Sequence, residues 1–191
     1  MQVDNFLPLN TINDLRQQAL NAKYEDWLGP DGVVYKRIAV VDIPEVRARL
    51  TEIYGEVDVL GMAFRANMNG EPPNQSIHTD VGWGTHAMVL YLTDGDSGTA
   101  FWKHIPSGRV ELPPLDIHAF IDVRKDWTDE SKWEIYDEIQ MKYNRAALYK
   151  SQLFHSRWPF KAFGTCMEDC RLTLVCFFTP KGEVDGGTVS V

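Results

Sequence analysis

Short apolar segments separated by turn-forming residues fill the chain from residue 57 onward, and this pattern constrains the fold more than any other feature. Glycine, proline, asparagine and aspartate separate several of these segments, as in NGEPPN and TDGDSG. Many short, aromatic-rich strands with turns between them favour a β-sandwich or jelly roll. The segments that we interpret as strands are 57–67, 86–92, 98–104, 117–123, 144–150 and 171–178.

Helical periodicity is confined to two N-terminal segments and one insert. In the first segment Thr11 and Asp14 resemble a capping box, and the second begins at Pro44 and ends before Gly55. Residues 33–40 between them are rich in β-formers. The insert at 128–142 has a Ser131–Glu134 capping box and an apolar stripe of Trp133, Tyr136, Ile139 and Tyr143. The predicted fold is therefore mainly β with flanking helices.

The length of 191 residues predicts a single domain with a core large enough to be stable by itself. We divide it into a helical N-terminal support at 1–55, a jelly-roll core at 56–180 and a tail at 181–191. The N-terminus has no basic or apolar signal region, and no apolar run is long enough to span a membrane. With three cysteines, an odd number, these features predict a cytoplasmic protein without a membrane role.

The charge balance bears on the choice of partner. There are 19 Lys+Arg against 27 Asp+Glu, which gives a net charge of −8. A protein that binds nucleic acid through its phosphates needs clustered basic residues, so this balance disfavours such a partner. Cys166 and Cys170 are best interpreted as free thiols, because a structural zinc site usually needs four nitrogen or sulfur ligands.

Two histidines and one carboxylate stand out as candidate metal ligands. His78 and Asp80 are two residues apart, so in an extended segment both point to the same side. His155 lies downstream at the edge of another strand-rich region. Two histidines and one carboxylate on one side of a metal form the ligand set of non-haem Fe(II) oxygenases, which leaves coordination positions open. The sequence alone also allows a surface pair and a core histidine.

Arg171 opens a strand that is otherwise almost wholly apolar. A guanidinium at a strand entrance presents a fork of N–H donors that matches a carboxylate. Thr173 lies on the same face of that strand and offers a hydroxyl. A surface charge and a hydrogen bond to a backbone carbonyl are the alternative interpretations of Arg171.

These residues resemble a known family, the 2-oxoglutarate- and Fe(II)-dependent dioxygenases. The stretches IHTD, GTAFWKH, YNRAALYKSQLFHS and RLTLVCFF occur in the order found in the core of that family. The resemblance extends over roughly residues 1 to 180, and its start at DNFL is similar to an uncharacterised microbial subgroup. It implies a double-stranded β-helix (a jelly roll, cupin-like) with His78, Asp80 and His155 as iron ligands.

The resemblance also implies an activity. The enzyme would use Fe(II), O2 and 2-oxoglutarate to hydroxylate a substrate, with succinate and CO2 as co-products and no catalytic residue beyond the metal centre. Arg171, with Thr173, would bind the distal carboxylate of 2-oxoglutarate. Many family members place this basic residue about ten positions after the distal histidine, whereas Arg171 lies 16 positions after His155. Lys161 and Arg157 are therefore competing candidates.

Several further residues are candidates for the same site. Tyr91 and Tyr149 are candidate co-substrate contacts, with plain core packing as the alternative. Arg65, Asn67 and Trp83 are candidates for the substrate side, and Gly82 and Gly84 would let Trp83 move as a lid. The substrate is expected to be a small molecule or a protein side chain, and the sequence predicts no oligomeric state. The alternative functions are a non-catalytic or differently metallated cupin-like binding protein, and a cupin-type enzyme with another co-substrate.

Overall fold

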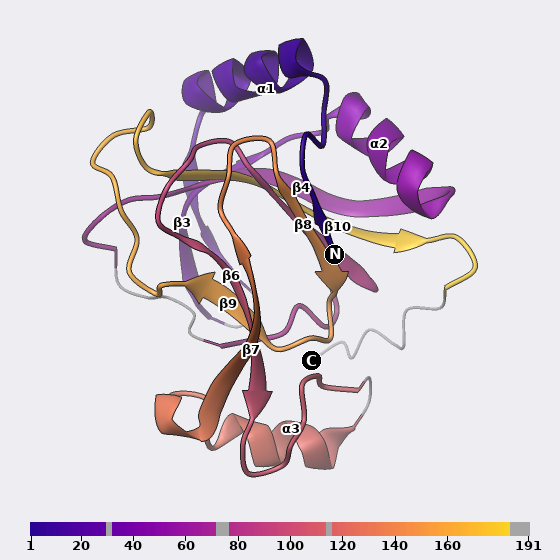
Figure 1. Cartoon of the computed structure of the whole chain (residues 1–191), viewed down its shortest axis with the longest axis vertical. Helices are drawn as coiled ribbons and strands as arrows, with labels where there is room; N and C mark the ends of the chain where they lie inside the picture. The colour runs from indigo at the N-terminus through magenta and orange to yellow at the C-terminus, as the bar shows by residue number, and fades with distance from the viewer. Residues whose placement is uncertain (30–31, 72–76, 114–115, 184–191) are drawn as a thin grey trace.

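The computed structural model describes residues 1–29, 32–71, 77–113 and 116–183 (Figure 1). Helices α1 (Leu9–Asn21), α2 (Pro44–Tyr54) and α3 (Ile117–Arg124) surround a body of strands. The strands are β1 (Gln2–Val3), β2 (Glu25–Leu28), β3 (Val34–Val40), β4 (Val57–Asn67), β5 (His86–Tyr91), β6 (Gly98–His104), β7 (Trp133–Gln140), β8 (Ala146–Lys150), β9 (His155–Trp158) and β10 (Arg171–Pro180).

Two antiparallel sheets form this body. The larger has the strand order β1-β8-β5-β10-β4-β3-β2, and the smaller has the order β7-β6-β9. Most pairs in the larger sheet join strands that are not consecutive, as expected of a jelly roll, and β10 lies between β4 and β5 near the middle of that sheet. The mainly β prediction with flanking helices is therefore confirmed. β1, β2 and β3 also show that the N-terminal part adds strands as well as helices.

Alternation along β10 separates two cores. Leu172, Leu174, Cys176 and Phe178 point to the face under α1 and α2, where they join the largest buried cluster (Figure 1). The alternate residues of β10, which begin with Arg171 and Thr173, face the smaller sheet. One strand therefore anchors the helices with one face and lines the space between the sheets with the other.

Leu174 provides a test of the helix-side core. It is fully buried opposite Phe64 and Leu90. We expect Leu174→Ala to lower the free energy of unfolding by about 2–5 kcal/mol, because the change leaves a cavity. Val40→Ala is the control: Val40 is 83% exposed, so its effect should stay within about 0.5 kcal/mol. Urea unfolding of both variants measures the difference, and equal midpoints would contradict this account of the core.

Two sequence-based predictions of secondary structure are wrong, and each has a physical reason. Residues 117–123, predicted as a strand, form α3, whose first turn is capped by Asp116 Oδ1 accepting from Ala119 N at 2.8 Å. Only Ala119 and Val123, one helical turn apart, are buried. The apolar residues of the run IHAFIDV fit the period of a strand and that of a helix. The cap and the four-residue spacing of the buried residues are those of a helix.

The predicted helix at 128–142 is instead a single 3-10 turn (Glu130–Lys132) followed by β7. β7 pairs along β6 from His104↔Trp133 to Gly98↔Gln140, so sheet pairing overrides the helical periodicity. The Ser131–Glu134 capping box is also absent, because Asp129 accepts from the Ser131 backbone N–H. At the N-terminus, α1 begins at Leu9 without a side-chain cap, before the predicted Thr11 cap.

Other sequence-based expectations are met or extended. The predicted segments at 57–67, 86–92, 98–104, 144–150 and 171–178 all contain strands, and the predicted second helix has the same bounds as α2. The short strands β1, β2 and β9 were not predicted. All three cysteines are free, and no described helix is long and apolar enough to cross a membrane.

Candidate metal and co-substrate site

His78, Asp80 and His155 converge between the two sheets. His155 begins β9, and its backbone exchanges two hydrogen bonds of 2.9 Å with that of His78. Asp80 is held by its own N–H, which donates to the Ser151 carbonyl at 2.8 Å. The backbone alone therefore brings the H-x-D segment and the distal histidine together, although 75 residues separate them in sequence.

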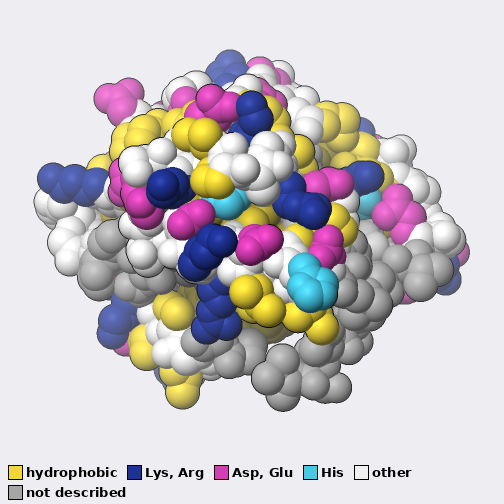
Figure 2. All heavy atoms as spheres, turned by 90° about the horizontal axis from the view of Figure 1, so that it is seen from below, with side chains coloured by type: hydrophobic (Ala, Val, Ile, Leu, Met, Phe, Trp, Pro, Cys, Tyr) yellow, Lys and Arg dark blue, Asp and Glu magenta, His cyan; other side chains and the backbone are white. Residues whose placement is uncertain are grey.

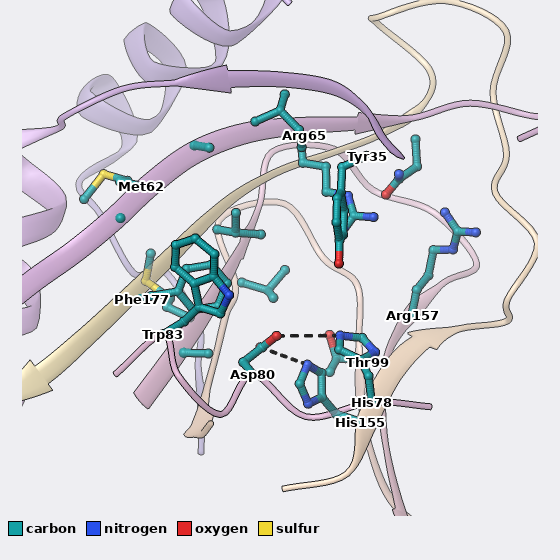
Figure 3. Close-up of a pocket in the computed structure, with 18 of the residues that line it drawn as sticks. Tyr35, Met62, Arg65, His78, Asp80, Trp83, Thr99, His155, Arg157 and Phe177 are labelled. Carbon is teal, nitrogen blue, oxygen red and sulfur yellow. Dashed lines mark ion pairs between the residues drawn. The ribbon is translucent and has the colours of Figure 1, made fainter. Parts of the chain in front are cut away.

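The ligand atoms of these three side chains lie within 4.8 Å of one another. His155 Nε2 is 3.1 Å from Asp80 Oδ2, and His78 Nε2 is 3.7 Å from Asp80 Oδ1 (Figure 3). Two imidazoles and one carboxylate on one side are the donor set of non-haem Fe(II) sites, so these residues fit a single divalent ion.

The surroundings of His155 orient it as a metal ligand. Its Nδ1 lies 2.9 Å from the Leu153 carbonyl oxygen, which can only accept a hydrogen bond. In the neutral imidazole the hydrogen is therefore on Nδ1, and the Nε2 lone pair faces Asp80 and His78. The Tyr149 ring packs 4.6 Å from the imidazole and limits its rotation.

Asp80 is suited to remain ionised at this site. Burial by itself raises the pKa of its carboxyl, but His155, His78 and the guanidinium of Arg65 outweigh that effect. The net result is a pKa below the ordinary value for aspartate. Asp80 therefore presents a carboxylate at neutral pH, as a metal ligand must.

A cavity of about 390 Å³ opens next to the triad, within the range usual for small-molecule sites. Trp83 and Phe177 lie on one side of the triad, Arg157 on the other, and Arg65 and Tyr35 across the cavity from it (Figure 3). Of the residues named as candidates from sequence, those that line it are the triad, Arg65, Asn67, Trp83, Tyr149, Arg171 and its competitor Arg157.

Arg171 is 5% exposed and is anchored on two sides. Its Nη1 donates to Asn67 Oδ1 and its Nη2 to the Gly98 carbonyl, each at 3.4 Å, and its guanidinium carbon lies 5.7 Å from the Tyr91 ring centre. Its Nε is buried without a hydrogen-bond partner among the described residues. These contacts hold the side chain in place and leave donor capacity for a ligand.

The remaining sequence candidates have other positions. Thr173 and Tyr91 are fully buried and do not line the cavity. The Thr173 hydroxyl donates to the Arg65 carbonyl at 3.4 Å, and the Tyr91 hydroxyl lies 2.8 Å from Thr99 Oγ1. Lys161, the competitor of Arg171, is exposed and lies outside the cavity lining.

Trp83 sits at the cavity edge between two glycines with positive φ, Gly82 at 100° and Gly84 at 99°. Its ring contacts Phe177 at 5.6 Å and Trp27 at 5.9 Å between centroids, and 38% of the residue is exposed. A side chain at Gly84 would meet Leu60 and the Phe178 carbonyl at 2.9 Å, so only glycine fits this bend. The bend therefore fixes where Trp83 enters the cavity wall.

Sequence reasoning missed some of the lining residues. Trp27 and Tyr35 come from β2 and β3 at one edge of the larger sheet, and no sequence pattern linked them to the H-x-D segment. Arg157 appeared only as a competitor of Arg171. Its position two residues after His155 on the same strand could have placed it on the same face as His155.

The fold matches solved structures of known enzymes. The α-ketoglutarate-dependent carbocyclase SnoK from nogalamycin biosynthesis aligns with TM-score 0.58 and 13% identity over 94% of this chain and 79% of its own. EctD from S. alaskensis, solved with 2-oxoglutarate and 5-hydroxyectoine, aligns with TM-score 0.55 and 13% identity over 100% of this chain and 76% of its own. A 2OG-Fe(II) oxygenase-family protein from Burkholderia pseudomallei aligns with TM-score 0.52 and 8% identity over 97% of this chain and 87% of its own.

No family model and no curated protein sequence matches this chain. At these identities the structural matches establish the fold, which is the double-stranded β-helix expected from the sequence. The assignment of its activity depends on the residues of the site.

Proposed function

We propose that this protein is an Fe(II)- and 2-oxoglutarate-dependent oxygenase that hydroxylates a small molecule or a protein side chain, with succinate and CO2 as co-products. The observation that carries the proposal is the convergence of His78, Asp80 and His155 at a cavity that also contains the buried Arg171. The structural neighbours with the same fold include proteins described as dependent on 2-oxoglutarate.

In this proposal each cavity residue has a defined role. His78, Asp80 and His155 would hold Fe(II), which, when bound with 2-oxoglutarate, supplies the activation of O2. Arg171 would bind the distal carboxylate of 2-oxoglutarate, and Asn67 and Gly98 would keep its guanidinium in place. Tyr149 packs against His155 and would limit the access of water to the metal side of the cavity.

The other sequence candidates have supporting roles in this proposal. Tyr91 would stabilise the Arg171 guanidinium through its ring. Thr173 would support Arg65 through the hydrogen bond to its carbonyl. Arg65, Asn67 and Trp83 remain on the substrate side, since all three line the cavity.

A nucleic-acid substrate is disfavoured by the charges. The net charge is −8, and the face seen in Figure 2 mixes acidic, basic and apolar side chains. Among the described residues visible there, no continuous basic stripe crosses this face. A protein that binds a nucleic-acid strand needs such a positive groove.

The proposal is tested by measuring succinate formed from 2-oxoglutarate with Fe(II), ascorbate and O2. We expect a release of succinate that depends on Fe(II). No succinate, together with tight binding of zinc and no binding of 2-oxoglutarate, would instead indicate a cupin-like binding protein.

A further inference from the structure

Three arginines line the cavity, more than one co-substrate carboxylate needs. Arg65 comes from β4, Arg157 from β9 and Arg171 from β10, so both sheets contribute. The Nε of each is buried without a hydrogen-bond partner among the described residues. None of the three forms an ion pair with a described carboxylate, whereas Lys36 at the cavity edge pairs with Asp26. Arg157 Nη2 donates to the Phe160 carbonyl, but this acceptor is neutral, so the cavity contains guanidinium groups without a described counter-ion.

The three arginines also interact unfavourably with one another. Burial and then the positive charge of Arg171 lower the pKa of Arg65. The Nε of Arg157 is buried in the lining of the same cavity. Buried like charges without counter-ions are costly, and an anion bound between them removes that cost.

The formal charges of the proposed complex indicate whether the substrate must supply further negative charge. Glu71 is paired with Arg37, so Asp80 is the remaining described carboxylate in the lining to set against the three guanidinium groups. The protein residues therefore carry two net positive charges, and a divalent metal adds two more. The two carboxylates of 2-oxoglutarate remove two. Two positive charges remain beside guanidinium groups whose Nε atoms are buried, where unpaired charge is costly, so a substrate with at least one further anionic group is favoured.

The two sides of the cavity differ in polarity. Arg157 lies on one side of the triad, and Arg65 lies across the cavity with its guanidinium carbon 5.4 Å from the Tyr35 ring centre (Figure 3). On the other side Trp83 and Phe177 form an apolar wall that Met62 extends (Figure 3). A ligand that satisfies both sides has an anionic group at one end and an apolar body at the other.

We infer that the substrate is a small amphipathic carboxylate, whose anionic group lies between Arg65 and Arg157 and whose apolar body lies against Trp83 and Phe177. This inference rests on the proposed function, because it reserves Arg171 for 2-oxoglutarate. It narrows the substrate class from any small molecule or side chain to free acids of modest size.

The test is calorimetric binding to the full-length protein loaded with Ni(II) and 2-oxoglutarate. The probes are phenylacetate, 3-phenylpropionate, indole-3-acetate and octanoate, each compared with its neutral amide, which has a similar shape. We expect at least one acid to bind at least ~10-fold more tightly than its amide, because only the acid forms charge-assisted hydrogen bonds. Equal affinity for every acid and its amide, or no binding of any acid, would overturn the inference.

Variants of the lining residues test which side chains cause the tighter binding of the acids. Arg65→Gln and Arg157→Gln should each weaken acid binding at least ~10-fold while changing the affinity for 2-oxoglutarate less than about twofold. Lys36→Gln, which removes a cavity-edge lysine already paired with Asp26, should change neither. Trp83→Ala should weaken acid and amide alike, since it removes apolar contact only. Where Arg65→Gln does not fold, Arg65→Lys, which loses the planar fork, replaces it.

The outcomes separate this inference from the proposed function. If Arg65→Gln and Arg157→Gln lose 2-oxoglutarate instead of the acid probes, the substrate assignment is wrong and the oxygenase proposal stands. If the wild-type protein with Ni(II) does not bind 2-oxoglutarate, the proposed function fails. The dependence of acid binding on Arg65 and Arg157 is then measured with Ni(II) alone, and acid binding that does not depend on them overturns the inference too.

Discussion

Replacing His155 with alanine is expected to reduce Fe(II)-dependent succinate formation by more than ~100-fold and leave the protein folded. His155 contributes one of three ligand atoms within 4.8 Å of one another. Even residues that only orient a ligand usually cost about 10–100-fold in metal affinity or activity, so the loss of a ligand itself exceeds that range. The backbone pairing between residues 155 and 78 does not require an imidazole, so the site's framework persists.

The fold and the metal site are measured separately from activity. Bound metal stabilises the folded state, by about 2.7 kcal/mol at a hundredfold excess over Kd, so Ni(II) should raise the wild-type melting temperature. His155→Ala should lose most of that rise. His118→Ala is the matched control, because His118 is exposed on α3 and does not line the cavity next to the triad. A His155→Ala protein with wild-type turnover and wild-type stabilisation by Ni(II) would disprove the assignment of the triad.

The sequence was most informative where a short-range rule sufficed. A short run of apolar β-forming residues predicted the strand that contains Arg171, and the two-residue spacing of His78 and Asp80 placed both on one side. The meeting of that pair with His155 came from the resemblance to a family and not from any local pattern. It depends on a long-range β-bridge, which periodicity in one segment does not reveal.

The wrong secondary-structure predictions arose where a segment fits both the helical and the strand period and tertiary contacts decide between them. Trp133 and Ile139 fit a helical stripe, yet both are buried residues of β7 because β6 offers an edge to pair with. The same limit applies within the site. Thr173 shares a face with Arg171, as predicted, but Arg65 and Tyr91 flank it on the neighbouring strands. Its hydroxyl therefore bonds the backbone, and the cavity is reached by its longer neighbours.

The second large effect is expected at Arg171, where Arg171→Met should raise the Kd for 2-oxoglutarate about 30-fold or more. Removing one partner of a buried, hydrogen-bonded charge pair typically costs about 2–5 kcal/mol. Methionine has similar length and no charge, so the packing against Tyr91 is largely kept. Titration of 2-oxoglutarate into the Ni(II)-loaded protein measures the change. Arg171→Lys keeps the charge and loses the planar fork of donors, so its Kd for 2-oxoglutarate should lie between those of the wild type and of Arg171→Met.

Two comparisons make this result specific to the distal carboxylate. 2-Oxopentanoate has the same chain length as 2-oxoglutarate and a methyl group in place of the distal carboxylate, so Arg171→Met should hardly alter its affinity. The preference of the wild-type protein for 2-oxoglutarate over 2-oxopentanoate should therefore fall close to one in the variant. Lys161→Met should leave that preference unchanged, because Lys161 is exposed outside the cavity. If the preference instead disappears in Lys161→Met and survives in Arg171→Met, the loop lysine binds the carboxylate, and Arg171 belongs with Arg65 and Arg157 on the substrate side.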